Sequence, residues 1–128
     1  MKEEDRQSMI THHREKAHHI LEQADLMMTM EQWDLAVNRY YYACFHIVQA
    51  LFVANGLSAH THSGSSTVLG QHFVKSGIVD FSYGRFFATM VQLRQKADYN
   101  SVANITEKEA RDIVEKTRDF VTKIESLI

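Results

Sequence analysis

The sequence of 128 residues is 45% apolar and 23% charged, with a formal net charge of −2 and an isoelectric point near 6.4. The length and composition fit a globular chain that buries one core, with residues 1–128 as a single domain. The net charge lacks the basic excess of a dedicated nucleic-acid binder, so any nucleic-acid site has to be local. Five glycines and no proline leave few tight turns, which disfavours a sheet protein and favours a few long helices.

Targeting and redox signals favour a cytoplasmic location. The longest apolar stretch is far shorter than the roughly 18–20 residues of a membrane span, and the first residues, MKEEDRQSM, are polar. The single cysteine, Cys44, excludes an internal disulfide and fits a reducing compartment. No glycine-rich phosphate loop or catalytic serine motif appears. We therefore expect a cytoplasmic protein with no membrane contact and no cofactor.

Apolar residues at three- and four-residue spacing predict five helices. An Asn-Gly dipeptide ends the second helix, Asp80 or Ser82 caps the fourth, and Thr106 with Glu109 forms a capping box for the last. The sequence therefore predicts an all-α bundle with short connections between antiparallel neighbours. The predicted helices cover about residues 3–28, 31–54, 65–74, 80–97 and 107–127.

The second predicted helix contains the stretch NRYYYACFHIVQAL, residues 38–51, in which polar residues interrupt a core-like run. Its apolar stripes cover well over half of its circumference, which places it at the centre of the bundle or at an interface with another subunit. Arg39 and His46 are about two helical turns apart and share one face. Two interpretations stay open for them. In the first, they belong to a functional site, as a displaced catalytic pair in which Arg39 also contacts a nucleotide phosphate. In the second, Arg39 pairs with a buried carboxylate, for which Asp98 is the candidate, and His46 is a hydrogen-bonded core residue.

The loop after the second helix carries Thr61, His62 and Ser63 close to the start of the short third helix. One interpretation is that these residues contact a phosphate, which the free backbone N–H groups of a helix start also favour. The other is structural capping of the helix by Ser63 or Ser65.

Other histidines raise the question of a metal site. His60, His62 and His72 have no cysteine or nearby acidic residue to complete a zinc site, and His12 and His19 lie two turns apart on one helix, too far to share a small ion by themselves. We therefore expect no bound metal.

Three further stretches are informative when taken together. They are AVNRYYYACFHIVQALFVANGL at 36–57, HTHSGS at 60–65 and GQHFVKSGIVDFSYGRFFATMVQLRQKADYN at 70–100. In this order they resemble the HEPN family (higher eukaryote and prokaryote nucleotide-binding domains), in its small stand-alone prokaryotic form. The resemblance implies an antiparallel up-and-down four-helix bundle with a short extra helix, commonly a homodimer, and an association with nucleotides or RNA. It also implies a toxin or accessory role beside a small nucleotidyltransferase.

Many active members of this family are metal-independent endoribonucleases that carry an arginine followed, after four to six residues, by a histidine. Arg94 matches the arginine, whereas Tyr99 stands at the histidine position. A phenol with an ordinary pKa near 10 is a poor general base. The resemblance therefore implies Arg94 as the anion contact, Asp98 as the group that orients it at i+4, and Tyr99 as a hydrogen-bond donor or a residue that the partner modifies with a nucleotide.

Three functional interpretations follow. The leading one is a nucleotide- or RNA-binding module that pairs with a nucleotidyltransferase and dimerises through the fourth helix and the polar stripe of the second. The second is an endoribonuclease that uses Arg94 with Tyr99, or with a histidine from elsewhere, His46 or His62. The third is a purely structural dimerisation module with no affinity for RNA.

Overall fold

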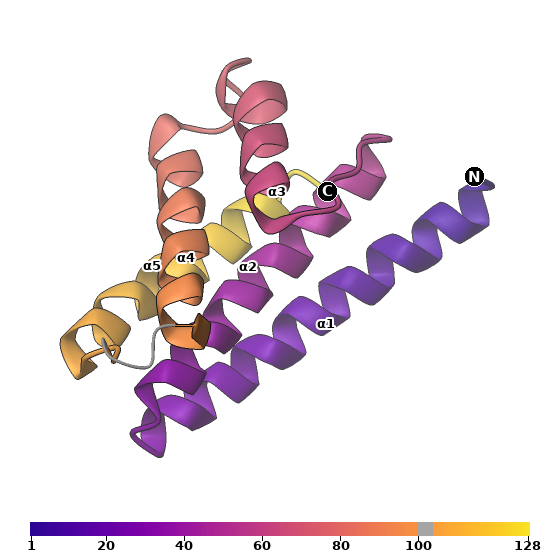
Figure 1. Ribbon diagram of the computed structural model, residues 1–128. Coiled ribbons are helices and arrows are strands. Elements are labelled where there is room, and N and C mark those ends of the chain that lie inside the picture. Colours follow the sequence, from indigo (N-terminus) through magenta and orange to yellow (C-terminus); the bar gives the residue numbers. More distant parts are fainter. Residues whose placement is uncertain (100–103) are drawn as a thin grey trace.

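The computed structural model (Figure 1) describes residues 1–99 and 104–128, apart from the side chain of Tyr99. Within these residues the secondary structure is entirely helical, so the predicted all-α bundle is confirmed. The helices are α1 (Glu3–Thr29), α2 (Trp33–Ala54), α3 (His62–Leu69), the π-helical turn η1 (Gly70–Val74), α4 (Phe81–Tyr99) and α5 (Glu107–Glu125).

Helix α2 is the centre of the bundle, as its apolar stripes predict. It contacts α1, α3, α4 and α5, and half of its 22 residues are buried. Its fully buried side chains include Tyr40, Tyr41, Leu51 and Phe52. Because burial of such large side chains removes most of their apolar surface from water, this helix supplies much of the hydrophobic stabilisation.

Helices α1 and α2 run antiparallel and side by side along most of their length (Figure 1). Small residues line this seam: Ala17 and Ala24 on α1, and Ala36, Ala43 and Ala50 on α2, are all fully buried. Alanine side chains allow the two backbones to approach closely, which explains why α1 and α2 form the most extensive helix pair.

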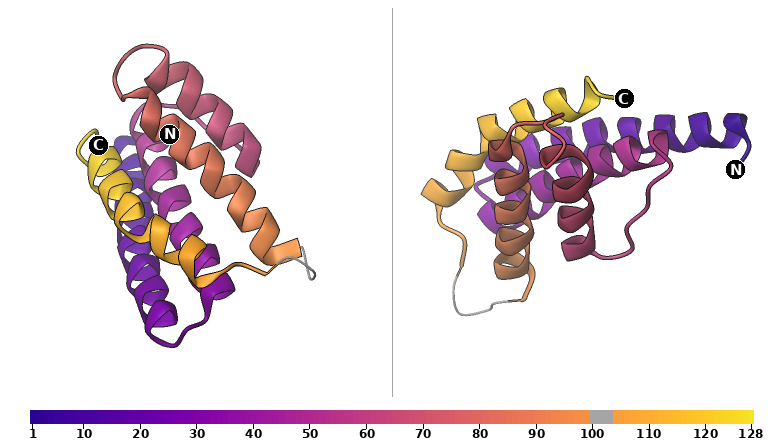
Figure 2. Two further views of the ribbon diagram at one scale, coloured as in Figure 1. Left: turned by 90° about the vertical axis from the view of Figure 1, so that its left-hand side faces the viewer. Right: turned by 90° about the horizontal axis from the view of Figure 1, so that it is seen from above.

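Helices α3 and α4 lie side by side and cross α2 obliquely (Figure 2). Helix α3 begins at His62, three residues before the predicted start, because Thr61 is its N-cap: the Thr61 hydroxyl accepts a hydrogen bond from the Gly64 amide at 2.8 Å. The expectation that Ser63 or Ser65 caps this helix is therefore wrong. The earlier start places His62 in the first turn of α3.

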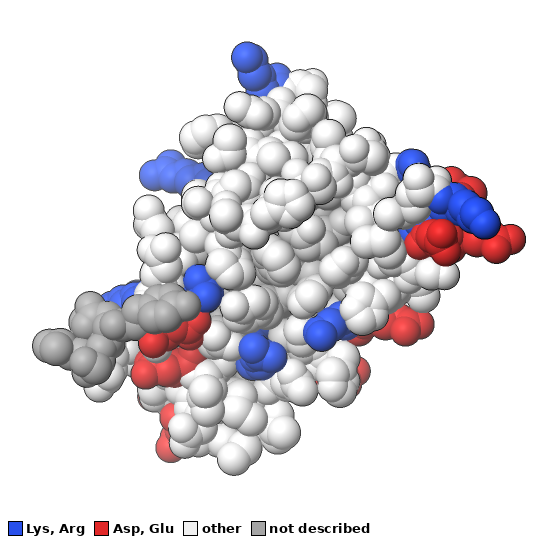
Figure 3. All heavy atoms as spheres, turned by 45° about the vertical axis from the view of Figure 1, so that its right-hand side comes forward, with Lys and Arg blue, Asp and Glu red and all other residues white. Residues whose placement is uncertain are grey.

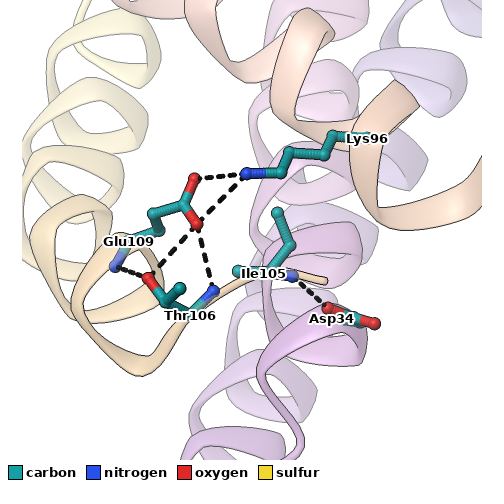
Figure 4. Close-up of polar contacts among 5 residues, drawn as sticks. All are labelled: Asp34, Lys96, Ile105, Thr106 and Glu109. Carbon is teal, nitrogen blue, oxygen red and sulfur yellow. Dashed lines mark hydrogen bonds and ion pairs between the residues drawn. The ribbon is translucent and has the colours of Figure 1, made fainter. Parts of the chain in front are cut away.

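The segment before α5 is attached to two other helices (Figure 4). The predicted capping box is confirmed, since Thr106 and Glu109 exchange hydrogen bonds between side chain and backbone. The Glu109 carboxylate also binds the Lys96 ammonium of α4 at 2.9 Å. The amide of Ile105 donates to the Asp34 carboxylate of α2 at 2.9 Å. These contacts fix the end of α4 relative to α2.

Within the described part of the chain, none of the helices combines the length and the apolarity that crossing a lipid bilayer requires.

Candidate functional site

The candidate site is centred on Arg94, a cation of α4 whose exposed fraction is only 8%. Its Nε atom lies 3.2 Å from the Asp98 carboxylate, one turn further along the same helix. The spacing of four residues stacks the two side chains on one face, so the sequence itself predicts this ion pair. The other oxygen of Asp98 accepts a hydrogen bond from the Asn38 amide group of α2 at 2.8 Å. The pair therefore lies where α4 crosses the start of α2.

Asn38 also determines the position of Arg39. The Asn38 side-chain oxygen accepts hydrogen bonds from Nε and Nη2 of Arg39, at 3.0 Å and 2.8 Å, and the guanidinium lies 5.2 Å from the centre of the Tyr42 ring. The expected direct pair between Arg39 and Asp98 is thus not what the structure shows. Asn38 stands between them, because an amide side chain offers an acceptor to the cation and a donor to the carboxylate.

His62 joins the cluster from α3. Its Nδ1 atom lies 2.6 Å from the hydroxyl of Tyr41, which is fully buried on α2. The pKa of His62 lies below its usual value, first because burial disfavours the imidazolium and then because Arg94 repels it; Asp98 opposes the shift. The Arg94 guanidinium lies 5.9 Å from the Tyr41 ring and 5.8 Å from the Tyr42 ring. Burial raises the pKa of the Tyr41 phenol, so this group keeps its proton.

The structure therefore brings Arg94, Asp98 and His62 together, with Arg39 attached through Asn38. Sequence reasoning did not assign roles to Asn38 and Tyr41. A signal was available, because both belong to the NRYYYA stretch that carries the family resemblance. Their contacts span 60 and 21 residues of sequence, however, so no local pattern identifies their partners.

The remaining predicted site residues lie elsewhere or in other roles. His46 faces α1, where its Nδ1 atom lies 3.0 Å from Nδ1 of His13. The Thr61 hydroxyl is engaged in capping α3. Ser63 is exposed, and its carbonyl accepts a hydrogen bond from the Thr67 hydroxyl. The prediction for Tyr99 concerns a side chain outside the described residues.

On the face drawn in Figure 3, Lys and Arg side chains do not gather into one patch: some stand alone among uncharged residues, and others lie beside Asp or Glu. Among the described residues, no group of three or more His, Cys, Asp or Glu side chains is placed so that it could hold a metal ion. A phosphate ligand would therefore depend on the local cluster around Arg94 rather than on a broad basic surface.

Fold and cluster together define a small all-helical protein with an arginine-centred polar site where α3 and α4 meet the central helix α2. The chain belongs to the HEPN domain family, whose model matches residues 10–127. A protein of Thermotoga maritima named "UPF0332 protein" is 36% identical over 124 residues, which are 97% of this chain and 94% of that relative.

Two proteins of Methanocaldococcus jannaschii are each named "Putative toxin". One is 37% identical over 93 residues, covering 73% of this chain and 69% of the relative. The other is 30% identical over 109 residues, covering 85% of this chain and 74% of the relative. The family resemblance read from the sequence is thereby confirmed, and it extends to relatives with a toxin name.

Proposed function

We propose that this protein is the toxin half of a two-component pair and that it acts by binding RNA phosphate at the cluster around Arg94. The observation that carries the proposal is the burial of Arg94 beside His62 and Asp98. A buried guanidinium is costly unless it is held by partners, and its planar fork matches the oxygens of a phosphate. The two relatives named as putative toxins support the assignment of this protein as the toxin of a two-component pair.

The test is binding of a labelled single-stranded RNA, measured by fluorescence anisotropy at 50 mM and 200 mM salt. Arg94→Ala is expected to weaken binding about tenfold at low salt and to reduce the salt dependence, because one charged phosphate contact is lost. Arg85→Ala is the matched control. Arg85 lies on the same helix but lines a groove between α4 and α5 with Lys116 and Asp119. Equal affinities of the two variants would contradict the proposal.

The proposed partner is a small nucleotidyltransferase, and the proposed form of this protein is a cytoplasmic homodimer that associates through α4 and the polar stripe of α2. The partner transfers a nucleotide to Tyr99: the phenol oxygen bonds to the α-phosphate of ATP, pyrophosphate leaves, and the phenol proton passes to solvent. Mass spectrometry after incubation with partner and ATP tests this step, with Tyr99→Phe as the control. An unmodified Tyr99 peptide would rule it out.

A second candidate function is metal-independent cleavage of RNA. It is favoured by the position of His62, because α3 brings an imidazole to Arg94 although Tyr99 occupies the histidine position on α4. In such cleavage the 2′-oxygen bonds to phosphorus and gives its proton to water, the bond from phosphorus to the 5′-oxygen breaks, and the 5′-oxygen takes a proton from water. The products are a 2′,3′-cyclic phosphate and a free 5′-hydroxyl. The test is incubation of labelled RNA with the protein in EDTA, beside Arg94→Ala. Cyclic ends formed by the wild type alone would establish the activity.

If the wild type neither binds nor cleaves RNA while folded and dimeric, the third interpretation, a structural dimerisation module, would stand instead.

A further inference from the structure

The hydrogen bond between Tyr41 and His62 determines which imidazole nitrogen carries the proton. The Tyr41 hydroxyl lies 2.6 Å from Nδ1, close to the ideal separation of a strong hydrogen bond. Tyr41 is fully buried, so its hydroxyl proton needs an acceptor. Among the described residues, the hydrogen-bond partner found for this hydroxyl is Nδ1 of His62, and the nearby Arg94 guanidinium has only donors. Nδ1 of His62 is the acceptor that remains.

An imidazole that accepts at Nδ1 has to carry its proton at Nε2 when it is neutral. The groups around His62 keep it neutral near pH 7: burial and Arg94 of α4 lower its pKa, and Asp98 of the same helix offsets only part of this effect. Tyr41 also favours neutral His62, because an imidazolium carries an N–H at Nδ1 that would face the proton of the phenol. With Nδ1 engaged, Nε2 is the ring atom left to contact a ligand.

We propose that Tyr41 fixes His62 in the Nε2–H form, so that His62 donates a hydrogen bond to the RNA phosphate held beside Arg94. Tyr41 is then a positioning residue, and neutral His62 serves as a donor rather than as a base. The identity of the ligand rests on the proposed function above, whereas the proton position does not. If RNA is cleaved, this assignment excludes Nε2 of neutral His62 as the acceptor of the 2′-hydroxyl proton.

Two substitutions of His62 separate a donor from a base. The side-chain amide of glutamine can place an N–H donor near the position of Nε2, but it cannot accept a proton near neutral pH. His62→Gln is therefore expected to bind single-stranded RNA within about threefold of the wild type, and His62→Ala about tenfold more weakly. Equally weak binding by both variants would overturn the donor role.

The position of the proton on the neutral His62 ring can be measured without RNA. Two-dimensional ¹⁵N–¹H spectra of the imidazole rings, assigned by comparison with His62→Gln, are expected to show His62 as a single Nε2–H form at pH 7.5. In Tyr41→Phe the pKa of His62 is expected to rise and RNA binding to weaken about threefold to tenfold. Tyr40→Phe is the control, because the Tyr40 hydroxyl bonds to Asp25 instead. It should leave both quantities unchanged.

The outcomes are distinguishable. An Nδ1–H form of His62 in the wild type would overturn the inference whatever RNA does. Loss of binding in Arg94→Ala with unchanged binding in Tyr41→Phe and His62→Ala would overturn the inference and leave the proposed function standing. No RNA binding by the wild type would remove the proposed function, and with it the ligand assigned to His62, even if the Nε2–H form is observed.

Discussion

His13 on α1 and His46 on α2 meet with their Nδ1 atoms 3.0 Å apart and their ring planes 27° from parallel. A hydrogen bond between two such nitrogens needs one to donate and the other to accept, so at least one ring has to be neutral. The pKa of His46 is lowered to about 4, by burial first and then by His13 and Lys16. The pKa of His13 is also lowered, chiefly by burial. The contact therefore joins α1 to α2 only while at least one of the two rings is neutral, and it is lost when both are protonated.

At acid pH, protonation at this contact is expected to lower the free energy of unfolding. The pKa of His46 is lower in the folded chain than the ordinary 6.5, so the unfolded chain binds more protons as the pH falls. The stabilisation is complete above pH 6.5 and is lost as the pH falls through about 4. Because the ring is only partly buried, we expect a loss on the order of 1–2 kcal/mol after allowance for screening.

Urea unfolding at a series of pH values from 7.5 to 4.5 measures this effect. His46→Gln removes the titrating ring, and its free energy of unfolding should depend less on pH than that of the wild type. A wild type and a variant with parallel pH profiles would show that another group causes the acid sensitivity.

Gly64 is expected to tolerate no side chain. A Cβ atom there would lie 2.6 Å from the Thr61 hydroxyl oxygen, which is the cap of α3. Gly64→Ala should therefore displace the cap and cost about 1–2 kcal/mol of stability. It should also weaken RNA binding, because His62 follows the cap directly.

Gly70→Ala is the matched control for this substitution. Nothing lies within 4 Å of a Cβ at Gly70, whose backbone is in the right-handed helical region. This variant should be as stable as the wild type or gain up to about 1 kcal/mol. Thermal unfolding of both variants decides the matter, and similar melting temperatures would refute the role of the Thr61 cap.

Asp34 is expected to anchor the start of α5 (Figure 4). Its carboxylate accepts the amide proton of Ile105, a residue whose exposed fraction is 4%. Asp34→Ala would leave this amide without its acceptor and should cost about 1–3 kcal/mol. Asp34→Asn keeps a side-chain oxygen and should cost less than half as much. Chemical denaturation measures both, and an equal loss in the two variants would argue for a purely electrostatic role.

Local sequence patterns predicted most of the helices because the signals act over a few residues. The capping box at Thr106 and the left-handed Gly56 after α2, with φ 68°, are where the sequence places them. The predicted start of α3 was wrong because three neighbouring residues with hydroxyl groups can each cap a helix. The sequence alone does not identify Thr61 as the residue that does so. Residue spacing likewise predicted the Arg94–Asp98 ion pair, since both residues belong to one helix.

The partners across helices were beyond such patterns. Tyr41 contacts His62, and His13 contacts His46, only because α2 packs against α3 and α1 in a particular register. That register depends on the shape of many side chains at once, such as the buried alanines between α1 and α2. A histidine at a buried position of a helix therefore indicates a polar neighbour, but the sequence pattern does not identify which residue that neighbour is.

The attachment of His62 to an eight-residue helix has a consequence for regulation. Such a short helix is held mainly by its contacts with α2, α4 and η1, so it can open as a local unit while α1, α2 and α5 stay folded. The free energy that assembles the site is then the docking energy of α3, which is smaller than the stability of the whole protein. A partner that binds α3 in its undocked form would inactivate the site without contacting Arg94. Hydrogen exchange should accordingly be faster at the amides of α3 than at those of α2.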